Sequence, residues 1–267
     1  MRFGLYLRGG GAKGAFQAGL LCAFWQRGVQ YSVIGGTSIG AVNGWFVLHN
    51  AYEEMKEFYL HMDQSVTDMK ASGSVINNSL LVKKLQDLQA NQDSSVEAFY
   101  VNYCPVQNGT LREKVEDLKG TDEAYAISRI GWSALLPYNL PEMDFAELKR
   151  YMDHTDLSLK FQEDLDRHVY DGLHLDGGLL NNLLIRNVLD HNCPRLLVLG
   201  YEGSREEYLE SLGDLPVSDR ERILYLASDE PFDGSDTYNF TPEFLKRRFS
   251  QGYDKGMSFP LIKLISG

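Results

Sequence analysis

The chain has 267 residues, enough to bury a sizeable core in one large α/β domain or in two small domains. Hydrophobic residues make up 43% of it and charged residues 24%, which is typical of a globular protein in water. The formal net charge of −11 argues against a nucleic-acid partner and against strong electrostatic binding to anionic membranes.

The cysteines and the N-terminus bear on the cellular compartment. Cys22, Cys104 and Cys193 form no CxxC pair, so we expect reduced core thiols and neither a disulfide framework nor a zinc site. A strand is expected directly after Met1, which leaves no secretory leader. No apolar run approaches the roughly 18 residues that a membrane-spanning helix needs. We therefore expect a cytoplasmic protein, with any membrane contact peripheral.

The first fifty residues predict a β-α-β-α unit and hence a parallel sheet. Short apolar runs at residues 3–7 and 31–34 are typical of buried strands, and helices are expected at 15–26 and 41–48. Residues 51–118 look like an insertion that carries amphipathic helices. We favour helical packing over a mobile lid for it.

The rest of the chain alternates strands with charged helical segments. Asn108-Gly109 predicts a turn, and Thr241 is expected to cap a helix that begins at Pro242. No internal repeat or linker divides the sequence, so we expect one domain over residues 1–267. The expected elements are strands at 97–103, 173–175, 195–200 and 223–226, a loop at 132–141, a helical excursion at 143–167 and a final helix at 241–259.

Gly36-x-Ser38-x-Gly40 stands between a predicted strand and a predicted helix, which is the sequence form of a nucleophile elbow. Glycines on both sides of the serine permit a turn too tight for side chains. The turn would lift Ser38 above the sheet beside a helix N-terminus, where a developing negative charge is favoured.

The glycine loop at residues 9–14 has the sequence Gly-Gly-Gly-Ala-Lys-Gly and admits more than one interpretation. Its spacing fits a dinucleotide-binding loop, but that loop needs an acid about 20 residues later, and no acid precedes Glu53. A kinase-type phosphate loop fails too, because Lys13 precedes Gly14 and no GK[ST] follows. What remains is a row of backbone N–H groups near Ser38, as an acyl-transfer oxyanion requires.

A base for Ser38 must also be found. No histidine follows His191, so a Ser-Asp-His triad in the usual hydrolase order is disfavoured. A carboxylate can take the serine proton if it is held against the hydroxyl in a site poor in water, where its pKa rises. Asp176, followed by Gly177 and Gly178, suits that task, because the glycines allow a close approach to the elbow.

Taken together and in this order, these segments resemble the patatin-like phospholipase family. Residues 9–14 match the family's oxyanion loop, 36–40 its elbow and 176–182, which end in Asn181 and Asn182, its base turn. Residues 133–137 look like the loop that lines the acyl site, and 251–254 look like the C-terminal helix. The proline that the family usually has soon after Asn182 is missing, and the insertions follow no family pattern.

The resemblance implies a three-layer α/β/α fold with a mostly parallel central sheet, and hydrolysis of lipid acyl esters by a Ser-Asp dyad without cofactor or metal. Ser38 would be the nucleophile that forms an acyl-enzyme, and Asp176 the general base. By the same resemblance, Gly9, Gly10 and Gly11 would bind the oxyanion, and Lys13 and Gly14 would support the loop. Lys13 could instead contact an acidic head group. Gly36 and Gly40 would shape the elbow, and Gly177 and Gly178 the base turn.

For several other residues we expect a structural role and not a functional one. His174 is expected to be a structural histidine, Trp45 and Phe46 to belong to the core, and 246–248 to form a solvated helix face. The expected partner is a lipid ester substrate, with no nucleic acid and no nucleotide. A small-ester hydrolase or acyltransferase with the same dyad, or a non-catalytic lipid-binding protein of this fold, remain as alternatives.

Overall fold

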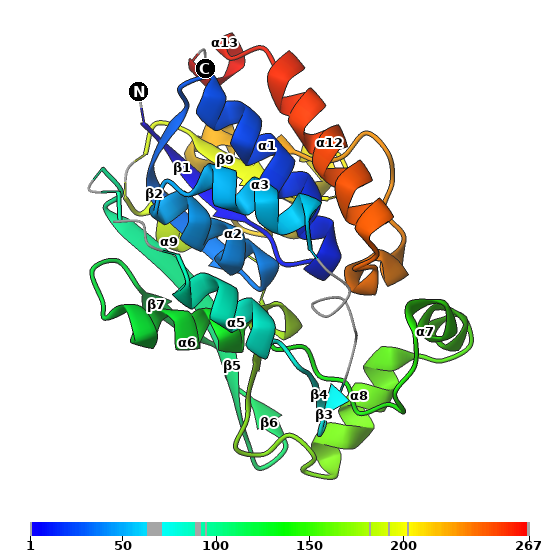
Figure 1. Cartoon of the computed structure of the whole chain (residues 1–267). Coiled ribbons are helices and arrows are strands. Elements are labelled where there is room, and N and C mark those ends of the chain that lie inside the picture. The colour runs from blue at the N-terminus through cyan, green and yellow to red at the C-terminus, as the bar shows by residue number, and fades with distance from the viewer. Residues whose placement is uncertain are drawn as a thin grey trace.

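The computed structural model describes residues 2–62, 71–88, 92–93, 95–181, 183–191, 193–201 and 203–265. A mostly parallel sheet forms its centre and helices pack around it (Figure 1). This is the α/β class expected from the sequence. Parts of the predicted insertion at 51–118, and Asn182 of the predicted base turn, lie outside the described residues.

The main sheet has eight strands, and its order along the connected path is β10-β9-β1-β2-β5-β6. From β10 to β5 each neighbouring pair is parallel, while β6, β7 and β8 are antiparallel to β5. The strands are β1 (Arg2–Leu7), β2 (Gln30–Thr37), β5 (Ala98–Gln107), β6 (Thr110–Leu111), β7 (Lys114–Asp117), β8 (His174–Asp176), β9 (Leu196–Leu199) and β10 (Ile223–Leu226).

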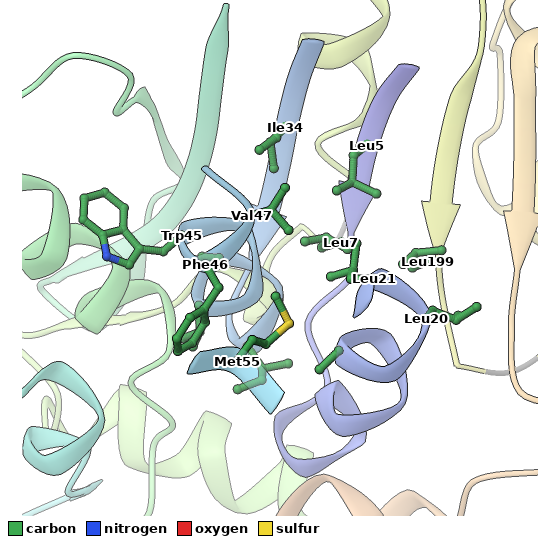
Figure 2. Packing of buried hydrophobic residues seen from close by; sticks show 14 of the residues in the cluster. Leu5, Leu7, Leu20, Leu21, Ile34, Trp45, Phe46, Val47, Met55 and Leu199 are labelled. Carbon is green, nitrogen blue, oxygen red and sulfur yellow. The ribbon is translucent and has the colours of Figure 1, made fainter. Parts of the chain in front are cut away.

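Successive apolar side chains along the strands point to opposite faces of this sheet, and both faces are covered by helices. Leu5 and Leu7 of β1 face one helical layer, whereas Tyr6 between them faces the other. The first layer contains α1 (Gly14–Gln26), α2 (Ile39–Leu48), α3 (Tyr52–Leu60) and α12 (Pro242–Ser258); the second contains α9 (Ile185–Leu189) and α10 (Arg205–Ser211). Figure 2 shows side chains of α1, α2 and α3 meeting Leu5, Leu7 and Ile34. The three layers are therefore those of an α/β/α fold.

The remaining elements flank this centre. Figure 1 shows α7 (Phe145–Met152) and α8 (Leu157–Asp166) at the end of the molecule away from both termini. The others are β3 (Ala71–Ser72) and β4 (Val75–Ile76), which pair as a small hairpin, α5 (Ser79–Gln86), α6 (Glu123–Ser133), α11 (Val217–Arg222), α13 (Ile262–Ile265) and three short 3₁₀ turns, η1 (Gly11–Lys13), η2 (Gly177–Leu179) and η3 (Gly234–Tyr238).

Most predicted elements are present. Asn108 and Gly109 have φ values of 50° and 66° and connect β5 to β6, as their sequence predicts. Trp45 and Phe46 lie in the core, and the three cysteines are buried free thiols. Over the part of the chain that the structure describes, every helix is too short or too polar to span a membrane.

One prediction was wrong, and another was confirmed only in part. Residues 132–133 belong to α6 and not to a loop; the Asp122 carboxylate starts this helix by accepting the Tyr125 N–H at 3.1 Å. Thr241 occupies the N-cap position of α12 and Pro242 begins the helix, as predicted, but the Thr241 hydroxyl donates to the Asn239 side chain at 2.8 Å and makes no hydrogen bond with the helix end.

The buried helix α1 depends on close contact with α12. Residues 14–24 are buried on every side, as expected for a helix held between a sheet and a second helix. Gly19 faces the backbone of α12, where an added Cβ would clash with the Phe249 carbonyl and lie 2.7 Å from the Tyr253 nitrogen. Glycine at this crossing lets the two backbones touch.

We expect Gly19→Ala to lower the free energy of unfolding by about 1–3 kcal/mol, because the helices must separate or strain to fit the methyl group. Urea unfolding followed by circular dichroism measures this loss. Gly234→Ala is the matched control, since a Cβ there meets nothing within 4 Å, and it should change stability by less than about 0.5 kcal/mol. Equal stability of the two variants would contradict the close-packing argument.

Candidate active site

The elbow lies between β2 and α2 and has the backbone geometry that its glycines allow. Ser38 has φ 57° and ψ −128°, a left-handed conformation that is strained for a residue with a side chain. A Cβ at Gly36 would lie 2.6 Å from the Gly40 carbonyl oxygen, and one at Gly40 would clash with the Leu7 carbonyl. Side chains at either position would therefore open the turn that presents Ser38.

Asp176 is brought to Ser38 by a strand that runs against the parallel direction of the sheet. It ends β8, pairs with Tyr103 of β5 and leads directly into η2. The Ser38 hydroxyl donates a hydrogen bond to Oδ2 of Asp176, while Oδ1 accepts the Gly178 N–H at 2.8 Å. Both carboxylate oxygens are thus engaged by the two turns that the sequence singled out.

The pair is buried, with Ser38 4% and Asp176 3% exposed. Burial disfavours the charged carboxylate and raises the pKa of Asp176 from 3.8 to about 7, although the hydrogen bonds from Ser38 and Gly178 act in the opposite direction. A carboxyl group with this pKa is a much stronger base than an ordinary aspartate. The arrangement can accept a proton from the hydroxyl near neutral pH.

Tight packing also shapes the base turn. A Cβ at Gly177 would clash with the side chain of Asn102, a fully buried residue of β5. The Asn102 amide donates to the Asn181 carbonyl at 2.8 Å and to the Glu113 carboxylate at 2.9 Å. Asn102 therefore holds both ends of the turn that follows Asp176.

The glycine loop lies against the elbow. A Cβ at Gly9 would be 2.9 Å from the Ser38 Cβ, and one at Gly14 would clash with Ile39 at the start of α2. Gly11 has φ 55°, and a Cβ there would clash with the Thr237 carbonyl of η3. Within the described residues, no backbone partner is recorded for the N–H groups of Gly10 and Gly11.

Two positions that sequence reasoning did not assign connect the elbow to the base. The Ser38 backbone N–H donates to the Ser133 hydroxyl oxygen at 2.8 Å, and the Asp176 N–H donates to the Leu135 carbonyl at 2.9 Å. The last residue of α6 thus contacts Ser38, and the loop directly after the helix contacts Asp176. The resemblance of residues 133–137 to a loop of the patatin-like family drew attention to this segment. No motif in the sequence predicted that Ser133 and Leu135 would contact Ser38 and Asp176.

The basic residues and histidines near the motifs have other contacts. Lys13 is 8% exposed, and its ammonium lies 5.8 Å from the ring centre of Phe232. The His174 ring stacks on Trp132 with 3.9 Å between ring centres. Nε2 of His191 is 2.7 Å from the Tyr100 hydroxyl. The hydrogen bonds recorded for the Ser38 and Asp176 side chains within the described residues involve no histidine.

One expectation for this region was wrong. Residues 246–248 were expected to form a solvated helix face, but Arg248 is 3% exposed and its guanidinium lies 4.0 Å from the Phe232 ring centre. Only Lys246 and Arg247 are exposed.

The described residues contain no group of three or more His, Cys, Asp or Glu side chains arranged to hold a metal ion.

The raised pKa of Asp176 predicts a pH-dependent effect on stability. Between pH 3.8 and about 7 the folded protein keeps a proton that the unfolded chain releases, so this residue lowers the free energy of unfolding as pH rises. Asp176→Asn carries no charge, and its stability gain over the wild type should be about 2–3 kcal/mol larger at pH 8 than at pH 5. Urea unfolding at the two pH values measures the difference, with exposed Asp190→Asn as control. A gain that does not depend on pH would show that Asp176 is charged in the folded protein throughout this range.

A family model, a relative and several solved structures are similar to this chain. The family model described as patatin-like phospholipase matches residues 5–189. Lysophospholipase nte1 of Aspergillus terreus is 54% identical over 41 residues, which are 15% of this chain and 3% of that protein. The crystal structure of VipD from Legionella pneumophila is similar over 96% of this chain and 66% of that chain, at 14% identity and a TM-score of 0.48.

The ExoU–SpcU complex of Pseudomonas aeruginosa is similar over 97% of this chain and 52% of that chain, at 15% identity and a TM-score of 0.38. The chain thus spans 52% to 66% of these solved structures and a small part of the lysophospholipase. Because the family model covers more than half of the 267 residues, this chain belongs to the patatin-like phospholipase family, a family of lipid ester hydrolases.

Proposed function

We propose that this protein is a serine acyl hydrolase that cleaves acyl ester bonds of lipids through a Ser38–Asp176 dyad and an acyl-enzyme. The observation that carries the proposal is the hydrogen bond from the Ser38 hydroxyl to a buried Asp176 carboxylate. Ser38 stands on a strained turn at the N-terminus of α2, and the Asp176 pKa of about 7 suits a general base.

In the first half-reaction, Asp176 accepts the hydroxyl proton as Oγ of Ser38 attacks the ester carbonyl carbon. The carbonyl oxygen becomes negative, and the N–H groups of Gly10 and Gly11, with Gly9, stabilise it; one such donor typically contributes about 3–4 kcal/mol. The tetrahedral intermediate then expels the alcohol, which takes the proton from Asp176. The acyl group stays on Ser38.

In the second half-reaction, water replaces the alcohol. Asp176 takes a proton from this water as the water attacks the acyl-serine. When the tetrahedral intermediate collapses, the bond between Oγ and the acyl carbon breaks, Asp176 returns the proton to Oγ, and the fatty acid leaves. No histidine is needed, because the carboxylate already contacts the hydroxyl and burial has raised its basicity.

We also propose that residues 1–267 form one domain. We further propose that this domain is cytoplasmic and binds its lipid substrate by peripheral contact with a membrane surface. β9 and β10 complete the same sheet as β1 and β2, which supports one domain. Leu180, four residues after Asp176, is 50% exposed, so an apolar side chain is available for a lipid surface next to the base. The free thiols Cys22, Cys104 and Cys193 suit a reducing compartment.

The deciding experiment compares hydrolysis of ester and phospholipid panels by the wild type, Ser38→Ala and Asp176→Asn. Both variants should fold and lose turnover by at least about a thousandfold, because each removes one partner of the proton transfer. Ser250→Ala and Asp190→Asn are matched substitutions at exposed positions and should retain full activity. Circular dichroism checks that all four variants are folded.

A fluorophosphonate probe separates the competing functions. A hydrolase or acyltransferase should be labelled at Ser38 in the wild type and unlabelled in Ser38→Ala, and acyl transfer to an added alcohol identifies the transferase. A non-catalytic lipid-binding protein would take up lipid and remain unlabelled. Full activity in Asp176→Asn would reject the dyad.

The proposal also predicts the pH profile. Asp176 must be deprotonated to act, so kcat/KM should rise about tenfold per pH unit below pH 7 and level off above it. Initial rates with a soluble ester whose own ionisation does not change between pH 4 and 9 measure the profile. An inflection near pH 4 would mean that burial does not raise the pKa of the base.

A further inference from the structure

Four buried polar side chains form a hydrogen-bonded network beside the glycine loop and take no part in the proton transfer proposed above. This loop network consists of Gln17 of α1, Asn43 of α2, Tyr59 of α3 and Tyr201, and each of them is at most 3% exposed. The buried residues of this helical layer are mainly apolar. Amide and hydroxyl groups in such surroundings are costly unless they are hydrogen-bonded, so the bonds that they make indicate their role.

Gln17 and Tyr201 hold the chain where the glycine loop begins. Nε2 of Gln17 donates to the Arg8 carbonyl at 3.0 Å and to the Leu199 carbonyl, at the end of β9, at 2.8 Å. The Tyr201 hydroxyl donates to the same Arg8 carbonyl at 2.9 Å. The Tyr201 ring packs against Gly10, where an added Cβ would clash with it. The start of the loop is therefore fixed by two side chains from different segments.

Asn43 holds the other end of the loop. Its Nδ2 donates to the Gly14 carbonyl at 3.1 Å and to Oε1 of Gln17 at 3.2 Å. Its Oδ1 accepts a hydrogen bond from the Tyr59 hydroxyl at 2.8 Å. One continuous chain of hydrogen bonds therefore connects α3 and α2 to both ends of the glycine loop.

Stability does not explain why these groups are polar. Replacing both partners of a buried hydrogen bond, such as Tyr59 and Asn43, by apolar groups of the same shape is often nearly neutral. A satisfied polar network instead fixes one arrangement of the groups that it joins. Burial raises the pKa of Tyr59 and of Tyr201, so both hydroxyls remain protonated donors near neutral pH.

We propose that the loop network aims the N–H groups of Gly10 and Gly11 at the oxyanion, so that its four members are positioning residues. The proposal rests on the hydrolase function proposed above and adds the side chains that preorganise its oxyanion donors. Such donors are effective because they need no reorganisation when the charge develops, and a displacement of about 1 Å can cost about a hundredfold in rate. Loosening the network should slow the chemical steps and leave substrate binding almost unchanged.

The test measures hydrolysis of a soluble p-nitrophenyl ester by Tyr59→Phe, Tyr201→Phe and Gln17→Met. Each Tyr→Phe variant loses one hydroxyl and should lower kcat about threefold to tenfold, whereas Gln17→Met loses both amide donors and should lower kcat about a hundredfold. Because kcat/KM should fall by the same factors, KM should stay within about twofold of the wild type. Tyr52→Phe is the matched control, since Tyr52 is a buried tyrosine of α3 outside the network, and it should keep the wild-type kcat.

An inhibitor pair separates aiming of the donors from general damage. When an alkyl trifluoromethyl ketone binds, Oγ of Ser38 bonds to the ketone carbon, the hydroxyl proton passes to Asp176, and the ketone oxygen becomes negative. The corresponding methyl ketone binds without this adduct. The Ki of the trifluoromethyl ketone should weaken by the same factor as kcat/KM in each variant, whereas the Ki of the methyl ketone should stay within about twofold. Equal weakening of both inhibitors would indicate a purely structural role and overturn the proposal.

The two Tyr→Phe variants each lack a single oxygen atom, so they decide the question even where Gln17→Met is unstable, and urea unfolding measures their stability. Wild-type kcat and wild-type trifluoromethyl ketone Ki in both of them would overturn the positioning proposal and leave the dyad standing. A failure of the hydrolase function looks different, because hydrolysis would survive Ser38→Ala and the trifluoromethyl ketone would bind that variant as tightly as the wild type. That result would overturn both proposals.

Discussion

A hydrogen bond between Ser38 and Asp176 joins two turns that are 138 residues apart in the chain, and much of the fold serves to form it. The parallel strands β1 and β2 bring the glycine loop and the elbow to the same edge of the sheet. β8 runs antiparallel to β5 and pairs with it directly beyond the end of β2, because Thr37 pairs with Asn102 and Asp176 pairs with the next residue, Tyr103. Ser133 at the end of α6 accepts the Ser38 N–H, and Leu135 in the loop after this helix accepts the Asp176 N–H.

This arrangement lowers stability at two points. The backbone of Ser38 is in a left-handed conformation, which typically costs about 1–3 kcal/mol. The Asp176 carboxylate is buried without a cationic partner among its recorded hydrogen bonds, so its charged form is disfavoured. The apolar layer around α1 and α2, where Leu20, Leu21 and Trp45 are fully buried, offsets these losses (Figure 2). Sites that carry out chemistry are often less stable than the scaffold that holds them.

The candidate active site and the helical excursion are built from different parts of the chain. The glycine loop and the elbow follow strands of the sheet, and the base turn follows β8, so their positions depend on strand register and close glycine contacts. A cavity of about 330 Å³ is lined mainly by α7, α8 and the loop at residues 137–140, and these segments are not part of the sheet. Segments of this kind change in sequence without disturbing the strands, which is how one fold comes to accept different substrates.

Local sequence predicted six of the eight strands of the main sheet, the elbow and the turn at Asn108 and Gly109, and it singled out Ser38 and Asp176 as candidates, because each of these depends on residues close together in the chain. Glycine patterns predicted where backbones come close, since only glycine permits the contacts seen at Gly36, Gly40 and Gly177. Tertiary structure alone decided that β8 runs antiparallel to β5, that Ser133 contacts the elbow, that Arg248 is buried, and that α8 forms a cavity wall. These features depend on which distant segments pack together and on how much water that packing excludes. The same burial raises the pKa of Asp176, which no local pattern in the sequence could indicate.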